Sequence, residues 1–427
     1  MKGLYIHIPF CKSKCPYCDF YSCLSRNADL KAYADAVCDE IKTLRRSEAF
    51  TKGKDLSFNT VYFGGGTPSV MPTEEIGRII CIAKEYFNIS ADAEITMECN
   101  PSTIDENYIK DIASYGVNRI SLGMQSAVDG ERKKLGRLSG RNKVLECIEN
   151  AKKHGITNIS LDVILGVPDQ TMQSLDETID FLLKTDVPHI SAYMLSIEEG
   201  TVFDKKRDTL NLPDEDTVCD MYMHLSERLR NAGYEHYEIS NFAKNEYRSR
   251  HNTKYWDCEE YLGVGPSAHS FIDGKRFFFE SNTTSFINGE KAVFDTAGGD
   301  SEEYIMLRLR LSDGICFKDY QNRFGKDFPA EIIKKALEFE KQGLMTVSVT
   351  GIALTTDGFL ISNYIISELI NSGIELTVDL YTKEFNPLAM VAKDVAAAAV
   401  VTSAFTALIV GIYIFLPKVI LLIKMHM

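Results

Sequence analysis

The chain has 427 residues, 45% of them hydrophobic, which exceeds the usual size of a single hydrophobic core, so two or three folding units are expected. Its formal net charge is -13 at pH 7, and no basic stripe offsets this acidic balance. A nucleic-acid backbone is therefore excluded as the principal partner.

The first 200 residues alternate short apolar runs with segments of helix length, a pattern typical of repeated βα units. Six strands are predicted, over residues 3–8, 60–63, 94–98, 119–123, 159–165 and 189–195. We predict an α/β fold in which six parallel strands and their helices form an incomplete (β/α)6 barrel. Ligands are expected at the carboxyl ends of the strands.

Three thiols follow the first predicted strand. Cys11, Cys15 and Cys18 have the spacing C-x3-C-x2-C, which can hold three irons of a cubane cluster and leave the fourth iron open. A disulfide-paired set is the first alternative, but residues 1–10 lack a secretory signal, which favours a reducing compartment. Zinc is the second alternative, but no second pair of ligands is visible. The other eight cysteines are dispersed and are expected to be packed free thiols.

A glycine loop follows the second predicted strand, with the sequence Gly64-Gly65-Gly66-Thr67-Pro68. Without side chains, the backbone N–H groups of such a loop can approach a ligand carboxylate closely. A tight turn from strand to helix would also explain the three glycines.

These motifs together resemble a known family. Tyr5-x-His7-Ile8-Pro9-Phe10 before the thiols, Cys15-Pro16-Tyr17-Cys18-Asp19-Phe20 and the glycine loop are similar to the radical S-adenosylmethionine (SAM) enzymes of the oxygen-independent coproporphyrinogen oxidase group. Within that group the chain is most similar to the HemW-like haem chaperones. The resemblance covers residues 1–370, and its further segments are 98–101, 120–126, 135–137, 162–171, 234–243, 251–256 and 354–359.

The resemblance implies that Cys11, Cys15 and Cys18 ligate a [4Fe-4S] cluster whose open iron takes the amino and carboxylate groups of SAM. The residues on the family's SAM positions are Tyr5, Gly65, Gly66, Thr67, Glu98, Gln125, Arg137 and Asp162. A guanidinium can pair with a carboxylate, and carboxylates can accept hydrogen bonds from ammonium and ribose hydroxyl groups. Taken singly, Glu98 or Asp162 could instead be a helix N-cap or part of a structural ion pair.

One departure separates two functions within the family. The oxidases carry another cysteine two residues after the third, where this chain has Phe20. The resemblance therefore implies haem binding and delivery to an unidentified acceptor protein, such as a membrane respiratory enzyme. Oxygen-independent coproporphyrinogen oxidation is the alternative. A second departure is Ser139, where the family usually has histidine, although Arg137 is retained.

The haem iron needs an axial ligand, which His, Cys, Met or Tyr can provide. The segment His251-Asn252-Thr253-Lys254-Tyr255-Trp256 resembles the family's HNxxYW motif, which is associated with haem handling. His251 is the first candidate, followed by His236, His269 and Cys258. A satisfied core or loop histidine is the alternative for each of the histidines.

The chain is expected to divide into a partial barrel (1–200), a family-specific extension (201–300), a winged-helix-like unit (301–367) and a tail (368–427). In the third part we expect helices over 301–310, 317–324 and 329–342, then a hairpin of residues 344–349 and 352–355. Winged helices often bind DNA, but the acidic charge favours packing or partner docking here.

The tail contains an uncharged run, Val395 to Leu416. Its 22 residues would extend about 33 Å as a helix, enough to cross a bilayer core of about 30 Å. A buried core helix is the alternative. We expect a transmembrane helix that tethers a cytoplasmic main domain to the membrane.

From Glu368 onward the chain resembles the later part of the prokaryotic diacylglycerol and undecaprenol kinases. The resemblance assigns Glu368, Asn371, Glu375 and the pair Lys393-Asp394 to a nucleotide-metal site, which suits carboxylates that hold Mg2+ on phosphate oxygens. The kinase's amphipathic helix and first membrane spans are missing, so lipid kinase activity is the weaker alternative. The two families share the text Ser367 to Ile370, which indicates a fusion at a short common sequence, with a genuine membrane-tethered variant as the alternative.

Overall fold

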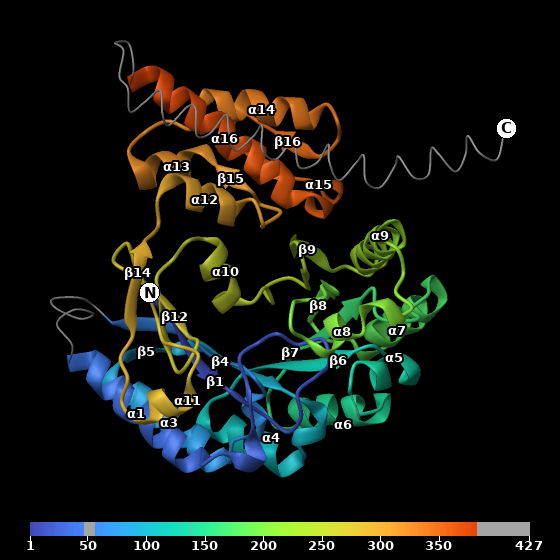
Figure 1. Cartoon of the computed structure of the whole chain (residues 1–427), viewed down its shortest axis with the longest axis vertical. Helices are drawn as coiled ribbons and strands as arrows, with labels where there is room; N and C mark the ends of the chain where they lie inside the picture. Colours follow the sequence, from blue (N-terminus) through green and yellow to red (C-terminus); the bar gives the residue numbers. More distant parts are fainter. Residues whose placement is uncertain (47–55, 138, 382–427) are drawn as a thin grey trace.

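The computed structural model describes residues 1–46, 56–137 and 139–381, with side chains up to residue 372, and within these residues twelve strands form one large sheet. The strand order is β14-β13-β12-β11-β1-β4-β5-β6-β7-β8-β10-β9 (Figure 1). Its six central strands are mutually parallel, and all six predicted strands are confirmed. They are β1 (Lys2–Ile8), β4 (Ser57–Gly65), β5 (Asn88–Cys99), β6 (Arg119–Gln125), β7 (Asn158–Leu165) and β8 (His189–Met194).

Side-chain alternation decides which residues of these strands face the helices and which face the barrel interior. In β6, Ile120, Leu122 and Met124 are buried in the core under the outer helices. The intervening residues Ser121 and Gly123 face the barrel interior, where Ser121 bonds Asp162 of the next strand. The helices between the barrel strands are α1 (Leu30–Arg46), α3 (Thr73–Tyr86), α4 (Glu106–Tyr115), α5 (Asp129–Lys134), α6 (Arg141–Lys153) and α7 (Met172–Thr185).

The segment 201–300 extends the barrel sheet at both edges. The strand β11 (Tyr261–Val264) runs parallel to β1, and we call the strands that follow it the wing: β12 (His269–Ile272), β13 (Lys275–Phe278) and β14 (Val293–Ala297). At the other edge, β10 (Asn241–Ala243) pairs antiparallel with β8 and β9 (Glu235–Glu238). The helices of this segment are α8 (Val202–Lys205), α9 (Glu215–Asn231), α10 (Arg250–Trp256) and α11 (Thr283–Ile287).

The unit at the top of Figure 1 combines helices with a small antiparallel sheet in the order β15-β17-β16. Its strands confirm the predicted hairpin, and its helices confirm the three that were predicted. Its elements are α12 (Ser301–Arg308), β15 (Ile315–Cys316), α13 (Phe317–Phe324), α14 (Ala330–Glu340), β16 (Met345–Val347), β17 (Gly351–Leu354), α15 (Thr356–Leu360) and α16 (Ser362–Tyr381).

Helix α16 runs through the expected junction between the two families. Ile365 and Leu369 are fully buried, and Glu368 forms an ion pair of 2.9 Å with Lys335 of α14. The first residues of the kinase-like text are therefore part of the helical unit's packing. The predicted span, 395–416, lies outside the described residues, and among the helices that those residues form none is both long and apolar enough to cross a bilayer.

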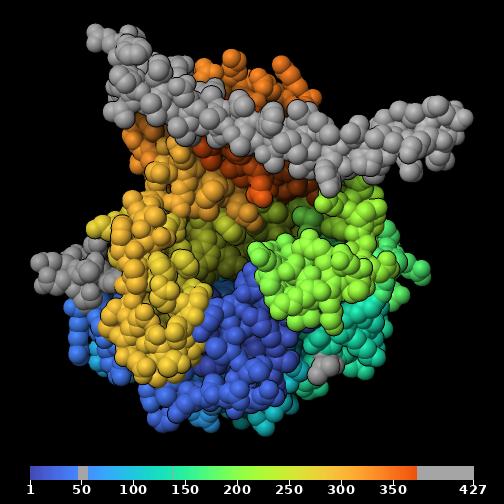
Figure 2. Space-filling view, in the orientation of Figure 1, coloured from blue at the N-terminus to red at the C-terminus, as the bar shows by residue number. Residues whose placement is uncertain are grey.

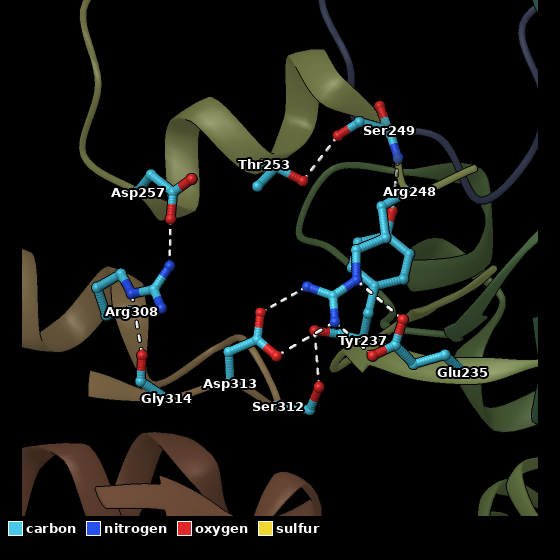
Figure 3. Close-up of polar contacts among 10 residues, drawn as sticks. All are labelled: Glu235, Tyr237, Arg248, Ser249, Thr253, Asp257, Arg308, Ser312, Asp313 and Gly314. Carbon is cyan, nitrogen blue, oxygen red and sulfur yellow. Dashed lines mark hydrogen bonds and ion pairs between the residues drawn. The ribbon is translucent and has the colours of Figure 1, made fainter. Parts of the chain in front are cut away.

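A polar seam joins the helical unit to α10, the helix that carries the HNxxYW-like segment (Figure 3). Arg248 donates 3.0 Å to Glu235 and 2.5 Å to Asp313. Arg308 pairs with Asp257 at the end of α10 and donates 3.0 Å to the Gly314 carbonyl. These contacts fix α10 between the barrel and the helical unit.

Candidate functional site

The three predicted cluster thiols lie on one loop at the carboxyl end of β1. Cys11 lies on the short strand β2 (Phe10–Cys11), which pairs with β3 (Cys23–Leu24), and Cys15 and Cys18 lie in the loop between these strands. All three thiols are free and partly exposed. Burial raises the pKa of Cys18, and the negative charges of Cys15 and Cys11 raise it further. The loop thus brings three thiols within electrostatic reach of one another.

Within the described residues, no three His, Cys, Asp or Glu side chains converge tightly enough to enclose a single metal ion. A cubane cluster asks for something different, because each of its irons takes one thiolate at a separate corner. Three free thiols spread along one loop fit that requirement. The assignment of Cys11, Cys15 and Cys18 as cluster ligands remains a prediction.

The glycine loop packs directly against the cysteine loop. The Gly66 N–H donates 2.8 Å to the Ile8 carbonyl, and the Thr67 N–H donates 2.8 Å to the Phe10 carbonyl. A side chain at Gly66 would meet the Phe10 carbonyl oxygen at 2.8 Å, which explains the need for glycine. The expectation that these N–H groups are free for a ligand is therefore wrong for Gly66 and Thr67.

Two other contacts of this loop connect it with the site. The Thr67 hydroxyl donates to the Cys11 thiol across 3.4 Å. Gly65 has a φ of +112°, and a Cβ there would lie 2.6 Å from the His7 ring. The glycine loop therefore contacts both the Cys11 thiol and the His7 ring in the barrel interior.

Two carboxylates face the barrel interior from neighbouring parts of the sheet. Glu98, at the end of β5, accepts a hydrogen bond of 2.8 Å from the Tyr62 hydroxyl. Burial raises the pKa of Glu98 to about 7. Asp162 of β7 accepts hydrogen bonds of 2.9 and 3.1 Å from Ser121, and burial raises its pKa as well. Each carboxylate already accepts hydrogen bonds from neighbouring hydroxyl groups, but neither forms an ion pair among the described residues, so each lacks a cationic partner.

Gln125 and Arg137 meet above Gly123. Gln125 has a φ of 71°, an uncommon conformation for a residue other than glycine. A Cβ on Gly123 would lie 2.9 Å from the Gln125 amide nitrogen and 3.6 Å from the Arg137 guanidinium. Arg137 donates 2.9 Å to the Tyr17 hydroxyl of the cysteine loop, and its Nε atom is buried without a partner. Among the described residues it has no carboxylate partner, which suits a residue that binds a ligand carboxylate.

Aromatic rings form the floor of the interior below Glu98. The rings of Tyr5 and Tyr62 stack with centroids 6.1 Å apart, and the Tyr5 hydroxyl lies 3.0 Å from His7. The His251 ring stacks on Tyr62 at 5.0 Å. Its two nitrogens lie 2.8 Å from the Thr60 hydroxyl and 2.9 Å from the Tyr255 hydroxyl. Burial lowers the pKa of His251 to about 3, so this histidine is a neutral part of the floor.

The other candidate haem ligands lie in different surroundings. His236 is buried between Ser226 and Tyr222, and burial lowers its pKa to about 4. Cys258 is buried, and burial raises its pKa. His269 is exposed on the wing, where its ring stacks on that of Phe278.

The structure also brings further residues, not predicted from the sequence, into contact with the candidate site residues. Tyr62 contacts Glu98, Ser121 and Ser160 bond Asp162, and Tyr17 bonds Arg137. For Ser160 a signal existed: it lies two residues before Asp162 on β7 and therefore on the same face. The sequence predicted Tyr17 as part of the cysteine motif, but not its contact with Arg137.

Three family models match parts of the chain. The family model of the Radical SAM superfamily matches residues 5–182, and that of the HemN C-terminal domain matches 301–361. The model of prokaryotic diacylglycerol kinase matches 343–415, which confirms the kinase-like text and overlaps the preceding match. The overlapping residues 343–361 form β16, β17 and α15 of the helical unit.

Whole-length relatives align with most of this chain. The chain is 32% identical over 374 residues to the heme chaperone HemW of Lactococcus lactis, covering 86% of this chain and 96% of the relative. It is 35% identical to the heme chaperone HemW of Escherichia coli, covering 72% and 82%. The mitochondrial radical S-adenosyl methionine domain-containing protein 1 of Bos taurus is 29% identical, covering 86% and 87%.

A solved structure supports the fold. The coproporphyrinogen III oxidase HemN of Escherichia coli, a radical SAM enzyme, superposes with a TM-score of 0.74, covering 86% of this chain and 89% of the other. At 22% sequence identity this likeness establishes the shared fold.

Proposed function

Because this chain belongs to the HemW family of the radical SAM superfamily, we propose that it is a haem chaperone that binds haem, a [4Fe-4S] cluster and SAM, and delivers haem to an acceptor protein. The observation that carries the proposal is the 32% identity over 96% of a curated heme chaperone. The residues in the barrel support it, since they supply the donors and acceptors that the cluster and SAM require.

The chain's own side chains would divide the work of holding these groups. Cys11, Cys15 and Cys18 would each ligate one iron, and the remaining iron supplies a site for the amino and carboxylate groups of SAM. Arg137 has a guanidinium with no carboxylate partner among the described residues. Glu98 lies near enough to the glycine loop to accept a hydrogen bond from Gly65.

Glu98 and Asp162 would accept hydrogen bonds from the ammonium and ribose hydroxyl groups of SAM. Tyr62 and Ser121 keep these two carboxylates in place. The Tyr5 ring lies in the floor beneath them. The Gln125 amide lies beside the Arg137 guanidinium above Gly123. A contact within the barrel supports each of these proposed roles.

One residue favours the chaperone over the oxidase. Phe20 stands where the oxidases of this group have a further cysteine, and its side chain is 64% exposed beside the cysteine loop. A phenyl ring cannot replace a thiol, whereas an exposed aromatic ring offers a contact for a flat apolar cargo. Phe20 therefore favours haem binding, and coproporphyrinogen oxidation is the weaker alternative.

We propose further that the tail attaches the cytoplasmic main domain to a membrane through residues 395–416. The absence of charge over 22 residues supports this role, and so does the match of residues 343–415 to a kinase family. The attachment would bring the chaperone near membrane respiratory enzymes as haem acceptors. Phosphoryl transfer is not part of the proposal, because Glu368 is held by Lys335 in the helical unit.

The experiment that tests the chaperone function follows haem from one protein to another. The purified, anaerobically reconstituted chain is loaded with haem, separated from free haem, and mixed with membranes that contain haem-free respiratory enzyme. We expect haem to leave the chain and enzyme activity to appear. A chain that takes up no haem, or that never releases it, would contradict the function.

A further inference from the structure

Among the histidines that the structure describes, His269 differs from the others because its ring has no hydrogen bond. In the part of the chain that the structure describes, six histidines have hydrogen bonds to their rings: His7, His154, His189, His224, His236 and His251. His269 is exposed, and no group among the described residues bonds its ring. Its imidazole nitrogens are thus free for a ligand from outside the chain.

Strand pairing shows which way His269 faces. Tyr261 of β11 pairs with Phe271 of β12, and the Tyr261 ring contacts that of Tyr255 on α10 at 4.6 Å. Tyr255 bonds His251 in the barrel floor, so this face of the sheet continues the barrel interior. The register between β12 and β13 is regular, and His269 lies two residues before Phe271. His269 therefore lies on the inner face.

A row of apolar side chains continues from His269 across the wing. His269 pairs with Phe278 of β13, and their rings stack with centroids 5.8 Å apart and an interplanar angle of 27°. Phe278 pairs in turn with Val293 of β14, which is 43% exposed. Neighbouring strands lie about 4.8 Å apart, so the three residues form a flat row about 10 Å long.

Residues that flank the wing strands contact the cysteine loop and the end of β1. Thr283, which follows β13, donates its N–H to the Tyr21 hydroxyl at 2.8 Å, and Tyr21 lies between Cys18 and Cys23. A Cβ on Gly265, before β12, would lie 2.7 Å from the His7 carbonyl oxygen at the end of β1. Figure 2 shows the yellow wing segment beside the blue N-terminal segment, with the surface hollowed where they approach the light-green residues.

We infer that His269 is the axial ligand of the haem iron, with the porphyrin resting against Phe278 and Val293. The inference rests on the proposed haem-chaperone function and adds to it the place where haem binds. An exposed imidazole supplies the ligand, and an aromatic and an aliphatic side chain supply the apolar wall that a porphyrin requires. His251 serves the barrel floor instead, since both of its ring nitrogens already have partners.

The competing ligands are less well placed. His154 and His224 lie on outer helices, where they contact Glu106 and Asp176. Cys258 and His236 are buried among protein groups. Binding of haem at Cys258 or His236 would require the chain to rearrange, whereas His269 is already exposed.

The test is a titration of the full chain with ferric haem, followed by absorption spectroscopy. The proteins are the wild type, His269→Ala, His251→Ala and, as a surface control, His224→Ala. We expect His269→Ala to weaken haem binding by at least about tenfold and to lose the bands of imidazole-ligated haem, because the iron loses its protein ligand. Added imidazole should restore those bands in His269→Ala, and Phe278→Ser should weaken binding without altering the ligand bands.

The outcomes separate this inference from the function on which it rests. A wild type that binds no haem overturns both. If the wild type binds haem and His269→Ala keeps its spectrum and affinity, the ligand assignment is wrong while the chaperone function stands. A spectral change in His251→Ala alone would assign the iron to His251. Cluster content, measured on every variant as iron and sulfide, checks that the fold is intact.

Discussion

The ring of Tyr62 stacks on that of His251 with centroids 5.0 Å apart, while the Tyr62 hydroxyl donates to Glu98. The histidine of the HNxxYW-like segment is thereby connected to Glu98, a carboxylate of the proposed SAM site. Since Thr60 and Tyr255 hold His251 from both sides, removal of its ring would free Tyr62 to move. The position of Glu98 depends on that tyrosine.

We therefore expect His251→Ala to lower the affinity for SAM by about tenfold, the effect of losing one well-placed hydrogen bond in the pocket. Equilibrium binding of SAM to the reconstituted protein measures it. His236→Ala is the matched control, because His236 is equally buried but contacts Ser226 and Tyr222 away from the pocket. Equal losses of SAM affinity in both variants would mean that the effect is general destabilisation.

The raised pKa of Glu98 predicts how pH changes the protein. Unfolded, this carboxyl titrates near 4.5, whereas in the folded chain burial moves its pKa to about 7. Between these values the folded state retains a proton that the unfolded state has lost, so the free energy of unfolding should fall as pH rises from 4.5 to 7. Glu98→Gln should make this slope shallower in urea unfolding of the cluster-free protein, while Asp162, whose pKa burial also raises, keeps part of it. Glu177→Gln, at an exposed site on α7, should leave the slope unchanged.

The affinity for SAM should rise with pH, whereas the free energy of unfolding should fall. Because the ionised carboxylate is the better acceptor for an ammonium group, SAM affinity should rise between pH 6 and 8 in the wild type. In Glu98→Gln that rise should be absent. A wild-type affinity that stays constant over this range would remove Glu98 from the SAM site.

Replacing any one of Cys11, Cys15 and Cys18 by serine should abolish the reconstituted cluster, because only two thiolates would remain for a cubane. Iron and sulfide analysis with absorption spectroscopy measures the cluster. Cys81→Ser is the control, since Cys81 is exposed on α3. Full cluster content in all three loop variants would refute the assignment.

Stopping the chain after Ile370 should release it from membranes while leaving haem and cluster binding intact. The last buried side chains against α14 include Leu369, which this truncation retains. Fractionation of cells that express the full and shortened chains measures the attachment. Neither form should phosphorylate lipid, and a full-length chain that stays in the soluble fraction would rule out the anchor.

The sequence was sufficient to predict the barrel strands because each combines an apolar outer face with flanking helix-length segments. The family resemblance supplied Glu98, Asp162 and Arg137 as candidate SAM residues, and their role stays a prediction. It could not show that the Gly66 and Thr67 N–H groups bond the cysteine loop, because that contact depends on how two loops pack. Nor could it reveal that His251 would bond Thr60, since the two residues are separated by 191 positions and meet only when α10 folds beneath the barrel.

The haem-chaperone function is tested most directly with one anaerobic sample of the reconstituted chain, supplied with SAM and a reductant. Haem and coproporphyrinogen are added to separate portions, and haem binding and decarboxylation are measured in each. We expect stable haem uptake and no conversion of coproporphyrinogen, since Phe20 stands where the oxidases have an additional cysteine. Rapid decarboxylation without haem uptake would contradict it and identify the chain as an oxidase.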